Sequence, residues 1–235
     1  MSIDQARQLQ RLLLGAGGHA RVLIDALQAA DETVAGVLDP RHAPGSRFDG
    51  LPVLGGDEWL EQQPSSSISL VNGVGANPTT ASRRALFERW CARGYRFDTV
   101  IHPSAVIAIS ARLSEGVQVL ARAVIQTGAV LAGNVVVNTG AIIEHDVAVA
   151  AHAFIGPGVV ICGDVRIGAA AFVGAGAVVL PGVTVGPDSI VAAGATVIRD
   201  VPAGQCVIGS SARERLPSSA APGVDGQGED SVGLA

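Results

Sequence analysis

An aliphatic residue recurs at every sixth position over nearly half of this chain. From Ile101 to Val197, all seventeen positions of the series are Ile, Leu or Val. A small residue, nearly always Ala or Val, stands two places before each of the later sixteen, as Ala141 does before Ile143. A period of six fits neither a helix nor a lone strand, but it is typical of a hexapeptide β-helix, in which each hexad is one short strand and a turn. We therefore expect residues 99–213 to wind as a solenoid.

The residue types within each hexad fit that solenoid. The long aliphatic side chain would point into a narrow core that the small residue shares without overpacking. Residues that tolerate a tight or left-handed backbone recur where the turns are expected: Gly116, Gly128, Asn134, Gly140, Asp146, Gly158, Asp164, Gly176, Gly182, Asp188, Gly194 and Asp200. If three hexads close one triangular coil, coils stack about 4.8 Å apart and residues eighteen positions apart lie above one another.

Composition narrows the classes of protein. Of 235 residues, 48% are hydrophobic and 3% aromatic, which suits large aliphatic cores, and the formal net charge is −5 without a Lys/Arg cluster. Nucleic acid is therefore not an expected partner. We find no apolar run of membrane-spanning length and no signal-peptide pattern, and we expect a cytoplasmic protein. The unpatterned cysteines Cys91, Cys162 and Cys206 predict neither a disulfide framework nor a zinc site.

A different pattern precedes the hexads. Residues 1–98 alternate predicted strands and helices, which indicates a small parallel α/β domain of Rossmann-like type. The expected strands are 11–14, 33–38 and 68–74, and the expected helices are 18–30 and 81–93. At the other end of the chain, residues 214–235 are small, polar and rich in Pro and Gly, so we expect a disordered tail.

The turn between the first predicted strand and helix is glycine-rich. It includes Gly17, Gly18 and His19, where free backbone N–H groups and the positive end of a helix can hold a phosphate. Asp39 ends the second predicted strand, where a carboxylate can accept hydrogen bonds from a ribose or a base. Tight packing alone would also explain the glycines, but their place between strand and helix favours half of a nucleotide site.

Within the hexads, residues 138–146 (NTGAIIEHD) gather polar and ionisable groups on an otherwise plain repeat. His145 follows the inward Ile143 by two places, so its ring should point outward or toward a neighbouring subunit. Asp146 could orient the ring and favour its protonated form. In the eighteen-residue register Gly163 lies above His145, which leaves a gap beside the ring and an accessible amide that could act as an oxyanion donor. The alternative is a surface histidine on a turn.

Several spaced motifs resemble one family. LLLGAGGHARVLIDAL near the N-terminus, IHPSA at 101–105, NTGAIIEHD at 138–146 and the hexads through VIGSSAR at 207–213 resemble NeuD/PglD-type sugar acyltransferases. Within this family the chain is most similar to bacterial N-acetyltransferases of perosamine and bacillosamine pathways, which modify a nucleotide-linked 4-amino sugar. The resemblance implies a Rossmann-like domain that holds the nucleotide, a left-handed parallel β-helix, a homotrimer, and acetyl-CoA in a groove between adjacent solenoids.

The resemblance also implies roles for individual residues. His145 matches the catalytic histidine and Asp146 the acid that raises its basicity. The positions expected to bind the substrate are Gly17, Gly18, His19, Asp39 and Gly75, which match the family, and Asn138, which we group with them. The positions expected to bind acetyl-CoA are Gly163, Ala175 and Ala193. The chain departs from the family where Phe154 replaces a frequent histidine, with His152 displaced into the preceding turn, and where residues 209–212 read GSSA instead of Gly-Val-Pro-Ala.

The resulting hypothesis is direct transfer of an acetyl group from acetyl-CoA to the amino group of a nucleotide-linked 4-amino-deoxy sugar, with His145 as general base and no metal. A sugar O-acetyltransferase would use the same fold and base. A nicotinamide oxidoreductase, a zinc-dependent trimer using His102, His145 and His152, and a sugar nucleotidyltransferase are further alternatives. The nucleotide, the sugar and the length of the acyl group stay open at this point.

Overall fold

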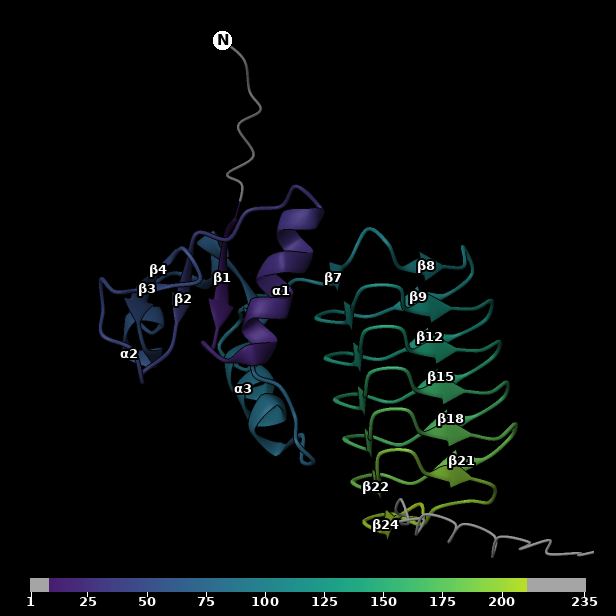
Figure 1. The fold of residues 1–235 in the computed structure, drawn as a ribbon. Helices are drawn as coiled ribbons and strands as arrows, with labels where there is room; N and C mark the ends of the chain where they lie inside the picture. Colours follow the sequence, from purple (N-terminus) through teal and green to yellow (C-terminus); the bar gives the residue numbers. More distant parts are fainter. Residues whose placement is uncertain (1–8, 211–235) are drawn as a thin grey trace, which may run out of the picture.

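The structure is a computed structural model that describes residues 9–210. An α/β body lies beside the upper coils of a parallel β-helix, and the chain passes directly from one into the other (Figure 1). The predicted combination of a Rossmann-like α/β domain and a hexapeptide β-helix is confirmed. The prediction of a disordered tail at 214–235 falls outside the described residues.

The α/β body is built on a six-stranded sheet with the order β3-β4-β2-β1-β5-β6, in which every pairing is parallel except β3 with β4. Its elements are β1 (Gln10–Leu14), α1 (Gly18–Ala29), β2 (Gly36–Leu38), β3 (Arg47–Phe48), β4 (Leu51–Gly55), α2 (Asp57–Leu60), the 3₁₀ helix η1 (Ser65–Ser67), β5 (Ile68–Asn72), α3 (Ala81–Cys91) and β6 (Arg96–Phe97). The strand predicted at 33–38 begins only at Gly36, and the strand predicted at 68–74 ends at Asn72.

Both faces of this sheet are buried, and alternate residues of β1 show why. Leu13 packs on one face with the apolar side of α1, whereas Leu12 and Leu14 pack on the other face with Trp90 of α3. A strand covered on both sides needs consecutive apolar residues, which Leu12, Leu13 and Leu14 supply. The strand order reverses at β1, whose neighbours are β2 and β5, so the carboxyl ends of β1 and β5 form the topological switch point of the sheet.

The β-helix has three parallel sheets, which we name sheets I, II and III. Sheet I contains β7 (Val100–Ile101), β10 (Gln118–Val119), β13 (Val136–Val137), β16 (Phe154–Ile155), β19 (Phe172–Val173), β22 (Ile190–Val191) and β24 (Cys206–Val207). Sheet II contains β8 (Val106–Ile107), β11 (Val124–Ile125), β14 (Ile142–Ile143), β17 (Val160–Ile161), β20 (Val178–Val179) and β23 (Thr196–Val197). Sheet III contains β9 (Arg112–Leu113), β12 (Val130–Leu131), β15 (Ala148–Val149), β18 (Arg166–Ile167) and β21 (Thr184–Val185).

The eighteen-residue register is confirmed by the strand pairing. Ile143 pairs with Ile125 on one side and with Ile161 on the other, and the same offset holds from coil to coil. The inward aliphatic residues and the small residues before them form one buried core from Val117 to Val201. The first coil is the exception, because Ile101 keeps 42% of its surface exposed at the open end of the solenoid.

Turn positions repeat as strictly as the core positions. Every sixth residue from Gly116 to Gly194 has a positive φ, including the predicted glycines, Asn134 and the aspartates 146, 164 and 188. His152 adopts the same left-handed conformation, as do Arg122 and Ala170, whose residue types do not favour it. Asp200, also expected at a turn, does not have a positive φ; its carboxylate accepts a hydrogen bond from the Thr184 amide.

Apolar and aromatic contacts join the α/β body to the β-helix. Helix α1 shares an apolar core with Val100 of β7 and with Leu120, which follows β10, and the Phe87 ring of α3 lies 5.7 Å from the ring of His152. None of the helices in residues 9–210 combines the length and the apolar character that crossing a bilayer requires. Together the contacts place the switch point of the α/β sheet next to sheet I.

Candidate active site

A cavity of about 690 Å³ lies at this switch point. The turn after β1 and the loop after β5 form two of its sides, and the β-helix closes a third with Asn138 and Phe154. The predicted substrate-binding residues Gly17, Gly18, His19, Gly75 and Asn138 all line it. Ligands of open α/β sheets bind at such positions, so the location favours a nucleotide site.

Glycine stands at the positions around this cavity for different physical reasons. A Cβ on Gly73 would lie 2.7 Å from the carbonyl oxygen of Leu14, so only glycine lets the two strand ends approach this closely. A Cβ on Gly17 or Gly18 would meet nothing within 4 Å. These two glycines leave open space at the N-terminus of α1, where the first-turn N–H groups lack helical partners and attract anions.

His19 is held in one tautomer by a chain of buried hydrogen bonds. The Gln118 amide nitrogen donates to the carbonyl of Asn72 at 2.8 Å, which leaves its oxygen to accept from Nε2 of His19, also at 2.8 Å. Burial, with the nearby Arg83 charge, lowers the pKa of His19 to about 4. A neutral ring that donates from Nε2 keeps Nδ1 as an acceptor. His19 therefore offers the ligand a hydrogen-bond acceptor and no positive charge.

Asp39 lies against the glycine-rich turn, and its role as a nucleoside contact stays a prediction. Only 2% exposed, its carboxylate accepts hydrogen bonds from the Ala16 amide at 2.7 Å and from the backbone and guanidinium of Arg41. These Arg41 and backbone hydrogen bonds outweigh burial and hold the pKa of Asp39 well below its usual range. Asp39 thus fixes the glycine-rich turn, and Arg41 lines the cavity. The sequence analysis does not single out Arg41, whose only signal is a basic residue three positions after the second strand.

His145 and Asp146 form a close pair at the turn after β14. Nδ1 of His145 lies 3.0 Å from a carboxylate oxygen of Asp146, and this hydrogen bond is the main reason that the pKa of His145 is raised. The pair lies between two glycines: a Cβ on Gly163 would come within 2.5 Å of Nε2 of His145, and one on Gly128 would collide with the Asp146 carboxylate. The Gly163 amide finds no hydrogen-bond acceptor within residues 9–210 and is free to donate.

A single chain does not bring all predicted site residues together. His145 and Gly163 stack at the corner that follows sheet II. Asn138, Ala175 and Ala193 lie at the corner that follows sheet I, where Asn138 lines the cavity at the switch point. The outer face of sheet II separates the two corners.

The positions that depart from the family have packing roles in the structure. The Phe154 ring stacks on Phe172 at 5.5 Å and lies 6.1 Å from the His19 ring, so it closes the cavity as an apolar wall. His152 instead faces the Asn134 amide at 3.0 Å and Glu88 at 3.6 Å. In the part of the chain that the structure describes, His102, His145 and His152 do not gather into a group that could hold a metal ion.

Comparisons with known proteins agree with this geometry. The model of the PglD N-terminal domain matches residues 12–89, and that of the bacterial transferase hexapeptide, six repeats, matches residues 164–199. PerB from Caulobacter crescentus, solved with CoA and GDP-perosamine, is 37% identical with a TM-score of 0.79, over 85% of this chain and 94% of its own.

A second solved structure is the acetyltransferase domain of PglB from Neisseria gonorrhoeae with acetyl coenzyme A, which is 33% identical with a TM-score of 0.78 over 86% of this chain and 97% of its own. This chain belongs to the NeuD/PglD-type sugar acyltransferases. UDP-N-acetylbacillosamine N-acetyltransferase of Bacillus subtilis is 34% identical over 119 residues, which are 46% of this chain and 50% of that relative. The match thus spans about half the length of that curated relative.

The gap at Gly163 gives a test of the His145 geometry. Gly163→Ala should displace the ring, because the new methyl group would come within 2.5 Å of Nε2. We expect acyl transfer to fall at least about tenfold, since misplacement of a catalytic group by a fraction of an ångström is costly, with the melting temperature little changed. Gly133→Ala is the matched control, because it holds the same position in its hexad and its new Cβ would meet only ordinary contacts, the nearest at 3.4 Å. Equal activity of the two variants would contradict the placement of the His145 ring beside Gly163.

Proposed function

We propose that the protein transfers the acetyl group of acetyl-CoA to the amino group of a nucleotide-linked 4-amino-deoxy sugar. The observation that carries this proposal is the His145–Asp146 pair beside the bare amide of Gly163. The glycine-lined cavity at the switch point supplies a place for the nucleotide. The relatives support the same chemistry, because PerB is described with CoA and GDP-perosamine and PglB with acetyl coenzyme A.

The mechanism follows from the position of each group. The sugar amine attacks the thioester carbonyl carbon and forms the new C–N bond, while Nε2 of His145 accepts the proton that the nitrogen loses. Asp146 holds Nδ1 of the ring and stabilises the imidazolium that forms. The Gly163 amide donates to the oxyanion of the tetrahedral intermediate. Collapse of that intermediate breaks the C–S bond, and the CoA thiolate takes the proton from the His145 imidazolium, which restores the neutral ring.

We also propose a homotrimer in which the corner carrying His145 of one chain meets the nucleotide corner of the next. The outward residues of five of the six strands of sheet II form an aliphatic column that no element among residues 9–210 fully buries: Val106, Val124, Ile142, Val160 and Val178. Sheet I is covered by the α/β body in its first coils, and sheet III presents Arg112 and Arg166 outward. An apolar face of this kind marks an interface.

The trimer can be tested on that face. Val160→Asp should introduce a charge into the buried seam and shift the protein from trimer to monomer in analytical ultracentrifugation, because an unpaired buried carboxylate costs several kcal/mol, about 3 or more. Thr184→Asp is the control, since Thr184 points outward from sheet III. A wild-type protein that sediments as a monomer would contradict the proposal, as would a Val160→Asp trimer.

Thiol release from acetyl-CoA tests the activity itself. With a panel of GDP-, UDP- and dTDP-linked 4-amino sugars, we expect CoA release with at least one, and His145→Ala should lower kcat about 10²- to 10⁴-fold, as loss of a general base does. The matching 4-hydroxy sugars are the control for O-acetylation. CoA release with hydroxy sugars alone would show that the acceptor is a hydroxyl group and not an amine. Full turnover by His145→Ala would remove this residue from the mechanism.

The raised pKa of His145 gives a pH dependence. General-base catalysis needs the neutral ring, so kcat/KM should rise with pH through a pKa above the ordinary 6.5. Asp146→Asn removes the hydrogen-bonded charge that favours the protonated ring, so the rising limb should move to lower pH while the plateau falls. The measurement is a pH profile of kcat/KM for both proteins. A limb that stays in place in Asp146→Asn would show that Asp146 does not set the basicity of His145.

A further inference from the structure

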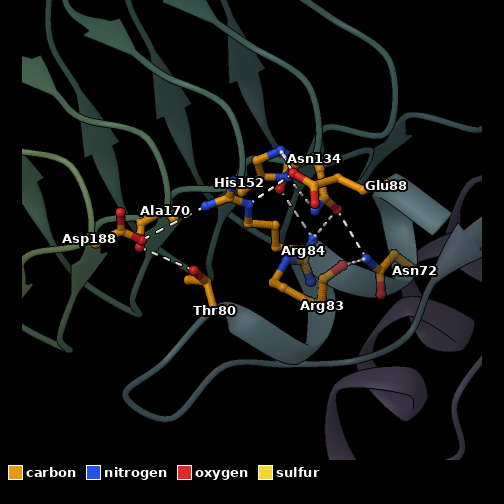
Figure 2. Close-up of polar contacts among 9 residues, drawn as sticks. All are labelled: Asn72, Thr80, Arg83, Arg84, Glu88, Asn134, His152, Ala170 and Asp188. Atoms are coloured by element: carbon orange, nitrogen blue, oxygen red, sulfur yellow. Dashed lines mark hydrogen bonds and ion pairs between the residues drawn. The ribbon is translucent and has the colours of Figure 1, made fainter. Parts of the chain in front are cut away.

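Arg83 is a completely buried cation on α3, at the junction of the α/β body and the β-helix (Figure 2). Nη1 donates to the carbonyl of Val74 at 2.6 Å, and Nη2 donates to the side-chain oxygen of Asn134 at 2.8 Å. Nη2 also donates to the Asn134 carbonyl at 3.3 Å, and all three acceptors are neutral. Within residues 9–210, no carboxylate lies within ion-pair distance of Arg83, and its Nε has no hydrogen-bond partner.

Such a charge is costly to bury. Buried charges in proteins are normally paired with an opposite charge, because the lost hydration is not replaced by neutral acceptors alone. Burial lowers the pKa of Arg83 to about 9, and the group is still charged at pH 7. An unpaired buried cation therefore needs a function that compensates for its cost.

The position of Arg83 suggests where its counter-charge belongs. Val74, which accepts from Arg83, is part of the loop 73–77 that lines the nucleotide cavity. The Arg83 charge also acts on His19, which lines the same cavity. The other cation there, Arg41, is already paired with Asp39. Arg83 is thus the cation behind the cavity wall whose charge is not neutralised by the described residues.

We propose that Arg83 is a positioning residue that holds the loop 73–77 in shape through Val74 and attracts, through that loop, the diphosphate of the bound nucleotide. This inference rests on the proposed function, and it adds a source of affinity for the diphosphate that does not touch the ligand. Arg83 donates no hydrogen bond to the ligand. Its contribution is electrostatic and therefore acts on the charged phosphates rather than on the base or the ribose.

Asn134→Asp tests the charge without removing the guanidinium. The substitution is nearly isosteric and puts a carboxylate oxygen where the Asn134 oxygen now accepts from Arg83 and from Asn72. Aspartate occupies the same left-handed position in other hexads, at Asp146 and Asp164, so the backbone tolerates it. His152 can meet the new oxygen by donating from Nδ1 as its other tautomer.

The measurement is isothermal titration calorimetry with GDP, UDP and dTDP and with the corresponding nucleosides. For the nucleoside diphosphate that the wild-type protein binds best, we expect Asn134→Asp to weaken affinity about tenfold, the effect of cancelling one screened charge near the phosphates. Affinity for the nucleoside should change less than about twofold, because it carries no phosphate. The melting temperature should not fall, since the new carboxylate compensates the buried guanidinium.

Two further variants separate charge from packing. Arg84→Gln also removes a positive charge from α3, but Arg84 is exposed and paired with Glu88, so diphosphate affinity should stay within about twofold. Arg83→Lys keeps the charge and changes the hydrogen bonds, so most of the preference for diphosphate over nucleoside should persist. If Asn134→Asp does not fold, the preference for diphosphate over nucleoside can still be compared between Arg83→Lys and the wild-type protein, and its loss in Arg83→Lys would contradict the inference.

The outcomes are distinguishable. Unchanged diphosphate affinity in Asn134→Asp would overturn the inference while the proposed function stands. Equal loss of nucleoside and diphosphate affinity would reduce Arg83 to a packing role and would also overturn it, as would loss of the diphosphate preference in Arg83→Lys. A wild-type protein that binds none of the three diphosphates would contradict the proposed function itself, and this inference with it.

Discussion

Parallel pairing between residues eighteen positions apart is the constraint on which the site depends. Each strand of the β-helix is only two residues long, so no strand fixes its own register; the stacked aliphatic core does, because a slip would turn Ile125, Ile143 and Ile161 away from it. Once this register is set, the turn residues must stack as well. His145 then lies beneath Gly163, whose missing side chain makes room for the ring. The catalytic geometry proposed here is therefore a by-product of core packing.

A second constraint orients the α/β body on this solenoid. Apolar contacts between α1 and sheet I could tolerate small shifts, but directional hydrogen bonds cannot. The side chain of Asn72, at the end of β5, donates both to the Arg83 carbonyl and to Asn134 of the β-helix, and the Asn72 carbonyl accepts from Gln118. This buried network, part of which is drawn in Figure 2, fixes the angle at which the switch point meets the β-helix. The shape of the nucleotide cavity follows, since its walls come from both parts.

The sequence predicts the parts of the structure that are periodic and misses those that depend on one side chain reaching another. Hexad arithmetic was enough to place His145 beside Gly163 and to predict most left-handed turns, but not those at Arg122 and Ala170, whose residue types do not favour that conformation. The strands β3 and β6 are too short to carry a pattern. The position of Asp39 after the second strand does not reveal that Arg41 and the Ala16 amide bind its carboxylate. Arg83 had no signal, because α3 carries several arginines and only the packing shows which one is buried.

The pairing of His145 with Asp146 is best understood from the environment that a seam between chains would create. In one chain the His145 side chain is 55% exposed, and water screens its attraction to Asp146. Covering the corner with a second copy would remove that water, which disfavours an isolated imidazolium but also strengthens the attraction between the two groups. A histidine alone would become less basic when covered. Paired with a carboxylate, it forms a unit with no net charge after it has accepted a proton, so the seam can exclude water without taking away the basicity that amine deprotonation requires.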